Sequence, residues 1–208
     1  MHHWRLSSFY FAYFALIGAI VPYWTLYLTS VNFDPIEIGF LASILMGTKV
    51  VSPYLFGWLS DKFQAPVSVI RITSALSLIA FSFIFITDSF VGTALVIASF
   101  SFFWNGQIGQ FESITLSHIS NDTSRYGGIR AWGSIGFIVS VLALGFLIKK
   151  NGINYLPLFM TVILFLIVLS SLIVNKTDQI KPHNEKKRFL HDFLKPNVIF
   201  FFLSLIHI

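Results

Sequence analysis

The chain has 208 residues, of which 55% are hydrophobic and only 11% are charged, and its mean hydropathy is +0.76. A soluble domain carries about 25% charged residues, so this composition excludes a water-soluble globule and indicates a protein that crosses a membrane several times. The sequence contains no cysteine, which excludes disulfides and thiolate metal sites. The net charge of +5 does not indicate nucleic-acid binding, because the basic residues cluster in the loops between apolar segments.

Six apolar segments are long enough to cross a hydrocarbon core of about 30 Å. We therefore predict an all-α membrane protein in which residues 1–174 form a bundle of six transmembrane helices. The predicted spans are Ser7–Thr29, Ile38–Leu59, Val69–Ile86, Val91–Ser113, Ala131–Ile148 and Tyr155–Val174.

The rest of the chain predicts a connector and the start of another helix. Residues 175–196 are polar and basic, as expected for a cytoplasmic central loop. Residues 197–208 are apolar but reach only roughly 18 Å as a helix, which is too short to span. We expect this seventh helix to be truncated and the chain to be half of a twelve-helix protein.

The distribution of Lys and Arg predicts the orientation. Most basic residues lie before the first span, in the even-numbered loops and in the connector, whereas Lys149 and Lys150 lie on the other side. Because loops rich in Lys and Arg stay in the cytoplasm, we expect both ends of the six-helix unit to be cytoplasmic.

Lys49 lies at the midpoint of the second predicted span. An ammonium in hydrocarbon is costly unless a carboxylate, a water-filled cavity or an anionic ligand offsets the cost. Its side chain is roughly 16 Å from either membrane surface, which is beyond the reach of a lysine that snorkels to the interface. Lys49 therefore indicates a solute pathway.

The loop after the second span reads Gly57-Trp58-Leu59-Ser60-Asp61-Lys62-Phe63. It resembles the signature loop of the major facilitator superfamily, G-x-L-x-D-R/K-x-G-R/K, with Gln64 and Ala65 in place of the second glycine and the following base. The resemblance implies the major facilitator fold. It also implies a conformational latch, to which we assign Gly57, Asp61, Lys62 and Arg71.

Polar residues continue along the fourth span and the start of the fifth. Asn105, Gly109 and Glu112 are spaced to share one helix face. Glu112 is interpreted either as an interfacial carboxylate or as a cavity residue, and Arg130 either as a positive-inside anchor or as its companion. Gly133 and Gly136 are expected to permit tight helix packing.

Glu112, with Arg130 inside Tyr126-Gly127-Gly128-Ile129-Arg130-Ala131-Trp132-Gly133, resembles the lactose permease pattern, in which such a pair flanks the sugar site. A narrower resemblance is to the phenylpropionate permease-like group, which implies proton-coupled uptake. It is carried by Tyr13-Phe14 with Gly18, Pro22-Tyr23-Trp24 and Leu26-Tyr27-Leu28, by Met46 to Pro53, and by Ser101 to Asn105, Gln110 to Glu112 and Arg130 to Ser134.

Two hypotheses follow for Lys49. It pairs with Glu112 across a cavity, so that protonation of the carboxylate is coupled to rearrangement, or it attracts a substrate carboxylate together with Arg130. Tyr23 and Trp24 are interpreted either as an aromatic wall for the ligand or as residues of the interfacial belt.

We therefore predict a secondary active transporter that moves a small organic solute, such as an aromatic carboxylate, sugar or nucleoside, together with protons. Its expected location is the inner membrane of a bacterium, and its expected partners are the substrate, protons, lipid and the missing C-terminal half. No motif indicates an enzyme, a cofactor, a metal site or nucleic-acid binding. The alternative is a non-transporting membrane fragment or scaffold from a truncated gene.

Overall fold

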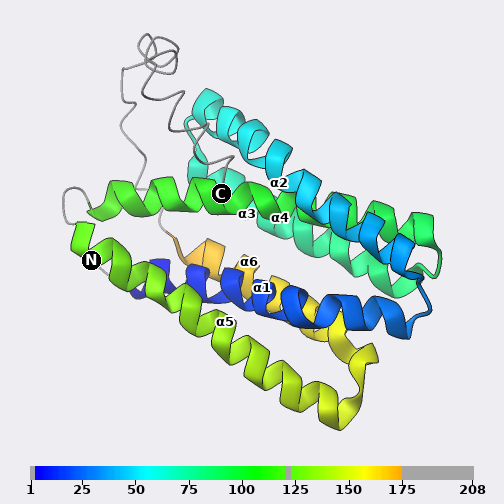
Figure 1. The fold of residues 1–208 in the computed structure, drawn as a ribbon. Helices are drawn as coiled ribbons and strands as arrows, with labels where there is room; N and C mark the ends of the chain where they lie inside the picture. The colour runs from blue at the N-terminus through cyan, green and yellow to red at the C-terminus, as the bar shows by residue number, and fades with distance from the viewer. Residues whose placement is uncertain (1–2, 120–122, 175–208) are drawn as a thin grey trace, which may run out of the picture.

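The computed structural model describes residues 3–119 and 123–174, and this part of the chain is helical almost throughout (Figure 1). The six long helices are α1 Trp4–Ser30, α2 Pro35–Phe63, α3 Pro66–Ser82, α4 Phe90–Ile119, α5 Thr123–Asn151 and α6 Leu156–Ile173. Two short 3₁₀ helices, η1 (Phe83–Ile86) and η2 (Ile153–Tyr155), extend α3 and precede α6.

All six predicted spans are confirmed as helices long and apolar enough to cross a membrane. α1, α2, α4 and α5 extend beyond the predicted bounds, because hydropathy marks only the part in hydrocarbon, whereas backbone hydrogen bonding continues into the interface. α6 begins and ends one residue inside its predicted bounds, and α3 gives way to η1 after Ser82. The predicted connector at 175–196 and the helix start at 197–208 lie outside the described residues.

Local signals in the sequence explain where α2 begins and ends. The Asp34 side chain accepts a hydrogen bond from the Glu37 backbone N–H at 2.8 Å, and the Glu37 carboxylate accepts one from the Asp34 N–H at 3.0 Å. This capping box satisfies two donors that the first turn of a helix leaves open. At the other end Gln64 is left-handed, with φ +49°, which explains why the signature loop has glycine at this position.

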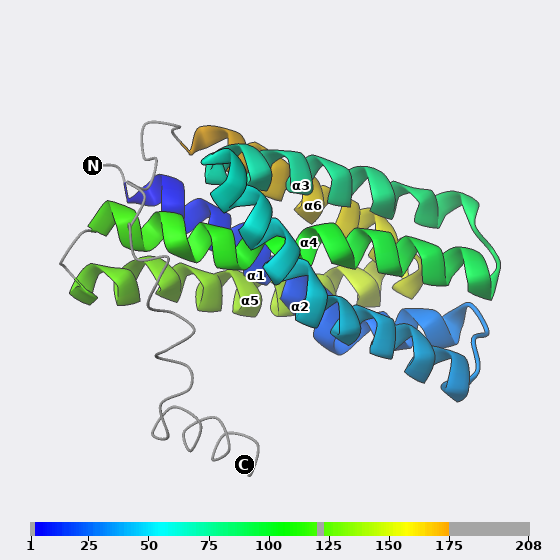
Figure 2. The same cartoon turned by 90° about the horizontal axis from the view of Figure 1, so that it is seen from above.

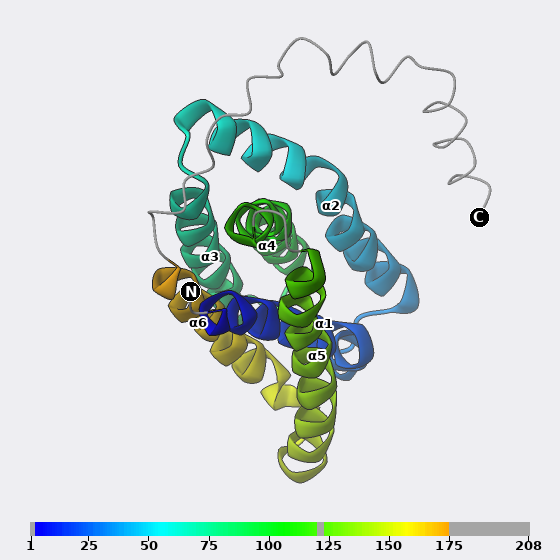
Figure 3. The same ribbon diagram turned by 90° about the vertical axis from the view of Figure 1, so that its left-hand side faces the viewer.

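The helices pack in a definite order, which the end view shows (Figure 3). α4 lies between α2 and α3, and α1 lies between α5 and α6, while α3 and α6 join the two groups. This pattern is unchanged when α1–α3 are exchanged with α4–α6, so it has the internal pseudo-symmetry of many transporter folds. The sequence does not reveal this repeat.

The core of the bundle lies around α1 and α4. Half of the apolar window of each of these helices is buried, against 17% for α2 and 22% for α5. α2 crosses α4 obliquely on the outside of the bundle (Figures 1 and 2). α2 and α5 therefore flank a side of the bundle on which much of their surface is uncovered.

Glycines allow α1 and α5 to approach each other closely. A Cβ at Gly136 would collide with the backbone carbonyl of Phe11, and one at Gly18 would lie 2.7 Å from the carbonyl oxygen of Phe137. Neither carbonyl belongs to a flexible side chain, so neither can move aside without displacing a helix. The expectation that Gly136 permits tight packing is confirmed. Gly133 also lies close to α1, because a Cβ there would come within 2.8 Å of the Phe14 ring.

Substituting Gly136 with Ala is expected to separate α1 from α5 and to lower the free energy of unfolding by about 1–3 kcal/mol, the usual effect of overpacking. The measurement is thermal unfolding in detergent. Gly128→Ala is the matched control, because a Cβ at Gly128 on the same helix meets nothing within 4 Å. Equal stability of the two variants would contradict the close contact.

Candidate functional site

An ion pair joins α4 to α5. The Arg130 Nη1 donates a hydrogen bond to the Glu112 Oε1 at 2.6 Å, and the two side chains keep 42% and 34% of their surface exposed. The two helices share few other contacts, so the pair bridges a space instead of lying inside a packed interface. It is accessible to a ligand and yet held in one place, as a binding residue requires.

Aromatic rings of α1 surround the arginine. The Arg130 Cζ lies 5.4 Å from the ring centre of Phe14 and 6.0 Å from that of Tyr10, within the range of cation–π attraction. The Tyr10 hydroxyl donates to Thr115 Oγ1 at 3.3 Å, and Tyr13 stacks on Trp104 at 5.0 Å. α1, α4 and α5 thus meet at a charge pair that has aromatic rings on its α1 side.

Asn105 is buried and binds α2, not the charged pair. Its amide donates to Thr48 Oγ1 at 2.9 Å, and the Thr48 hydroxyl donates to Ser101 Oγ at 2.9 Å. One turn further along α2, the Ser52 hydroxyl donates to the backbone carbonyl of Phe102. These bonds hold α2 against α4 where apolar contacts alone provide little force in a bilayer.

Lys49 is exposed and, within residues 3–119 and 123–174, forms neither a hydrogen bond nor an ion pair. Its neighbour Thr48 contacts Asn105, which precedes Glu112 by seven residues, about 10 Å along the helix axis. The Lys49–Glu112 pair of the first hypothesis is not formed, since Glu112 binds Arg130 instead. The second hypothesis, in which Lys49 and Arg130 attract a carboxylate, remains a prediction.

Tyr23 and Trp24 lie apart from the charged pair. The Tyr23 hydroxyl donates to the carbonyl of Val141 at 2.7 Å, which fastens α1 to α5. Trp24 is buried and stacks on Tyr27 at 5.3 Å. The rings beside Arg130 are those of Tyr10 and Phe14, one turn apart on α1; their spacing gives no sign that they meet an arginine of α5.

The predicted latch residues do not contact one another as a group. Arg71 donates to the carbonyls of Ser171, Leu172 and Val174 at 2.6–3.3 Å, so it caps the end of α6. Lys62 lies 4.8 Å from the ring centre of Trp58. Asp61 is exposed, and Gly57 faces the side chain of Gln110. Asp61 and Lys62 thus remain open to a partner beyond the described helices.

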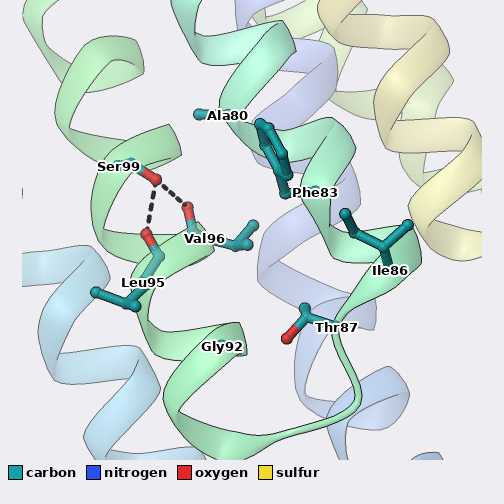
Figure 4. A pocket seen from close by; sticks show the side chains of 8 residues that line it. All are labelled: Ala80, Phe83, Ile86, Thr87, Gly92, Leu95, Val96 and Ser99. Atoms are coloured by element: carbon teal, nitrogen blue, oxygen red, sulfur yellow. Dashed lines mark hydrogen bonds between the residues drawn. The ribbon is translucent and has the colours of Figure 1, made fainter.

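Some hollows of the bundle are mainly apolar. Figure 4 shows one of about 330 Å³ between η1 and the start of α4, lined mainly by apolar side chains such as Phe83, Ile86 and Leu95. The Ser99 hydroxyl there binds the carbonyls of its own helix. Within the described residues no group of three His, Asp or Glu side chains is placed to hold a metal ion.

Comparison with known proteins gives consistent results. The chain is 32% identical over 145 residues to the uncharacterized transporter YwbF of Bacillus subtilis (strain 168), covering 69% of the chain and 36% of YwbF. It is 26% identical over 148 residues to a probable 3-phenylpropionic acid transporter of Escherichia coli (strain K12), covering 69% and 38%. The chain thus spans little more than a third of the length of these curated relatives.

The fold is also that of a solved transporter. The crystal structure of the nucleoside transporter NupG superposes with a TM-score of 0.80 at 22% identity, covering 99% of the chain and 54% of NupG. The model of the MFS_1 like family matches residues 3–208. Its members are transporters and not enzymes. The chain therefore belongs to the MFS_1 like family of the major facilitator superfamily of membrane transporters.

Proposed function

We propose that the chain is the first half of a secondary carrier that moves a small organic solute with protons by alternating access across a bacterial inner membrane, with its N-terminus in the cytoplasm. The observation that carries this proposal is the partly exposed Glu112–Arg130 pair. Charged side chains are costly in hydrocarbon, so those within transmembrane segments pair with one another or face water, and they mark substrate and proton pathways.

The pair offers a simple means of proton coupling. A proton that binds the Glu112 carboxylate makes it neutral and breaks the charge-assisted bond to Arg130. The guanidinium is then free to bind a substrate carboxylate or hydroxyls through its parallel donors. Release of substrate restores the ion pair and returns the proton on the other side.

The surroundings favour a substrate with an aromatic or other flat apolar part. Phe14 and Tyr10 lie beside Arg130, and Phe14 is partly exposed whereas Tyr10 is buried, so a substrate ring can pack against Phe14 where a carboxylate binds Arg130. Lys49 supplies a second positive charge on α2 for the same anion. The name of the E. coli relative, a probable 3-phenylpropionic acid transporter, is consistent with this class; a sugar or nucleoside would use the same pair through hydroxyl groups.

The partner of this half is a second six-helix bundle. The surfaces of α2 and α5 are largely uncovered, and the chain spans about half of NupG. In transporters built of repeats, the substrate lies at the interface between the halves. Asp61 and Lys62 are placed at the end of α2, where a latch would contact the second half.

In the full-length carrier, Glu112→Gln and Arg130→Gln are each expected to lower proton-driven uptake of a 3-phenylpropionate-like acid about 30-fold or more. Removing one partner of a hydrogen-bonded charge pair costs roughly 2–5 kcal/mol. Lys49→Ala is expected to lower uptake as well. The measurement is radiolabelled uptake in vesicles at equal expression.

Two controls make this experiment specific. Glu37→Gln changes the same functional group in the capping box of α2 and should leave uptake unchanged. Exchange of substrate without a proton gradient should survive in Glu112→Gln, because only coupling is lost. Normal uptake by both Glu112→Gln and Lys49→Ala would overturn the site assignment.

The 208-residue chain alone is expected to show no uptake in vesicles above the background of empty vesicles, because half of the substrate site is absent. Co-expression with a separate second half should restore uptake, provided that the two halves associate. Uptake by the chain alone would contradict the two-half proposal, and failure of the combined halves would favour a non-transporting scaffold.

A further inference from the structure

A second hollow lies on another side of the bundle. It is an apolar groove of about 680 Å³ along α1, bounded by α5 and α6. We call it the α1–α5–α6 groove, and its main walls are Trp4, Phe11, Trp132, Leu166, Leu169 and Ile173. It forms because α5 and α6 both pack on α1 but scarcely touch each other (Figure 3).

The groove faces away from the proposed substrate site. Trp132 follows Arg130 by two residues, which is about 200° around the helix. The Arg130 side of α5 therefore meets Glu112, whereas its Trp132 side meets the groove. α6 forms the far wall of the groove and lies on the side of the bundle away from α2 (Figure 3). When the six helices span a bilayer, as their length and hydropathy allow, a groove open between α5 and α6 is accessible to lipid.

The polar atoms of the groove provide little for a soluble ligand. The Ser8 hydroxyl donates to the carbonyl of Arg5 at 3.0 Å, and the Ser170 hydroxyl donates to the carbonyl of Ile167 at 2.8 Å. Such bonds within a helix leave the walls apolar. A hydrocarbon chain fits these walls better than a solute with many hydroxyl groups.

The groove has a guanidinium beside one of its walls. His3 borders it, and the Arg5 guanidinium lies 5.6 Å from the ring centre of Trp4, which lines it. The Arg5 Nε is buried without a hydrogen-bond partner in the described chain. The first turn of α1 contains no acidic residue. An anion beside this turn is therefore attracted by the Arg5 guanidinium and is not repelled by a carboxylate of the same turn.

We propose that the α1–α5–α6 groove binds one anionic phospholipid, with an acyl chain between α5 and α6 and its phosphate beside Arg5. Trp4 and Trp132 both line the groove, and tryptophan rings favour the glycerol region of a bilayer. This inference does not depend on the proposed substrate, because the two sites lie on opposite sides of the α1–α5 pair.

Quenching of tryptophan fluorescence by brominated lipids tests this site directly. The 208-residue chain that keeps only the two groove tryptophans, Trp4 and Trp132, is placed in phosphatidylcholine vesicles that contain brominated phosphatidylglycerol or brominated phosphatidylcholine. Half-maximal quenching is expected at an about fivefold lower mole fraction of the anionic lipid. Arg5→Gln should abolish this preference, whereas Lys62→Gln, which removes a charge from α2 outside the groove, should preserve it.

A second pair of variants tests the groove itself and retains all tryptophans. Ser8→Phe fills the groove and should reduce the amount of phosphatidylglycerol retained by the purified chain in native mass spectrometry. Ser43→Phe adds the same ring at an exposed position on α2 and should not. Equal quenching by the two lipids, protection of Trp4 and Trp132 from both by a second copy of the chain, or equal retention by the two Phe variants would overturn the proposal.

Discussion

Hydrocarbon cannot solvate a charge or a polar backbone group, and this constraint determines most of the structure. The backbone forms helices that satisfy their own hydrogen bonds, and hydroxyls such as Thr73, Ser77 and Thr115 bind carbonyls of their own helix. The Glu112–Arg130 pair follows the same constraint differently: each charge has the other as its partner and retains access to solvent. A charged pair that stays partly accessible to solvent distinguishes a transport pathway from the packed core of a helix bundle.

Small residues and short polar bonds, more than hydrophobic burial, determine how the helices pack, because lipid is as apolar as the helices themselves. Gly18 and Gly136 allow the backbones of α1 and α5 to touch, and Gly106 leaves room for the Phe56 ring between α2 and α4. The hydrogen bond from Asn105 to Thr48 helps to fix the orientation of α2 against α4. The internal exchange makes the α1–α5 pair equivalent to the α4–α2 pair. The charged pair links the two, because Glu112 is on α4 and Arg130 is on α5.

The two sides of the α1–α5 pair differ in chemistry. One carries Arg130 with aromatic rings and a carboxylate, and the other carries Trp132 over an apolar groove. In the proposed carrier, the first side binds solute at the interface of two halves and the second binds lipid. Arg71 holds the end of α6, the outer wall of the groove, through three backbone carbonyls.

The sequence by itself determined the six spans, the family resemblance, the presence of glycines that permit close packing and the identity of the charged residues, because hydropathy and motif spacing are local properties. Only the tertiary structure decided which charges meet: Arg130, not Lys49, binds Glu112, since pairing depends on how α4 and α5 are placed around α1. It also placed the Tyr10 and Phe14 rings beside Arg130, and the Arg71 guanidinium against the carbonyls at the end of α6. These are contacts between distant segments, and their geometry is set by helix rotation and crossing, which no local pattern encodes.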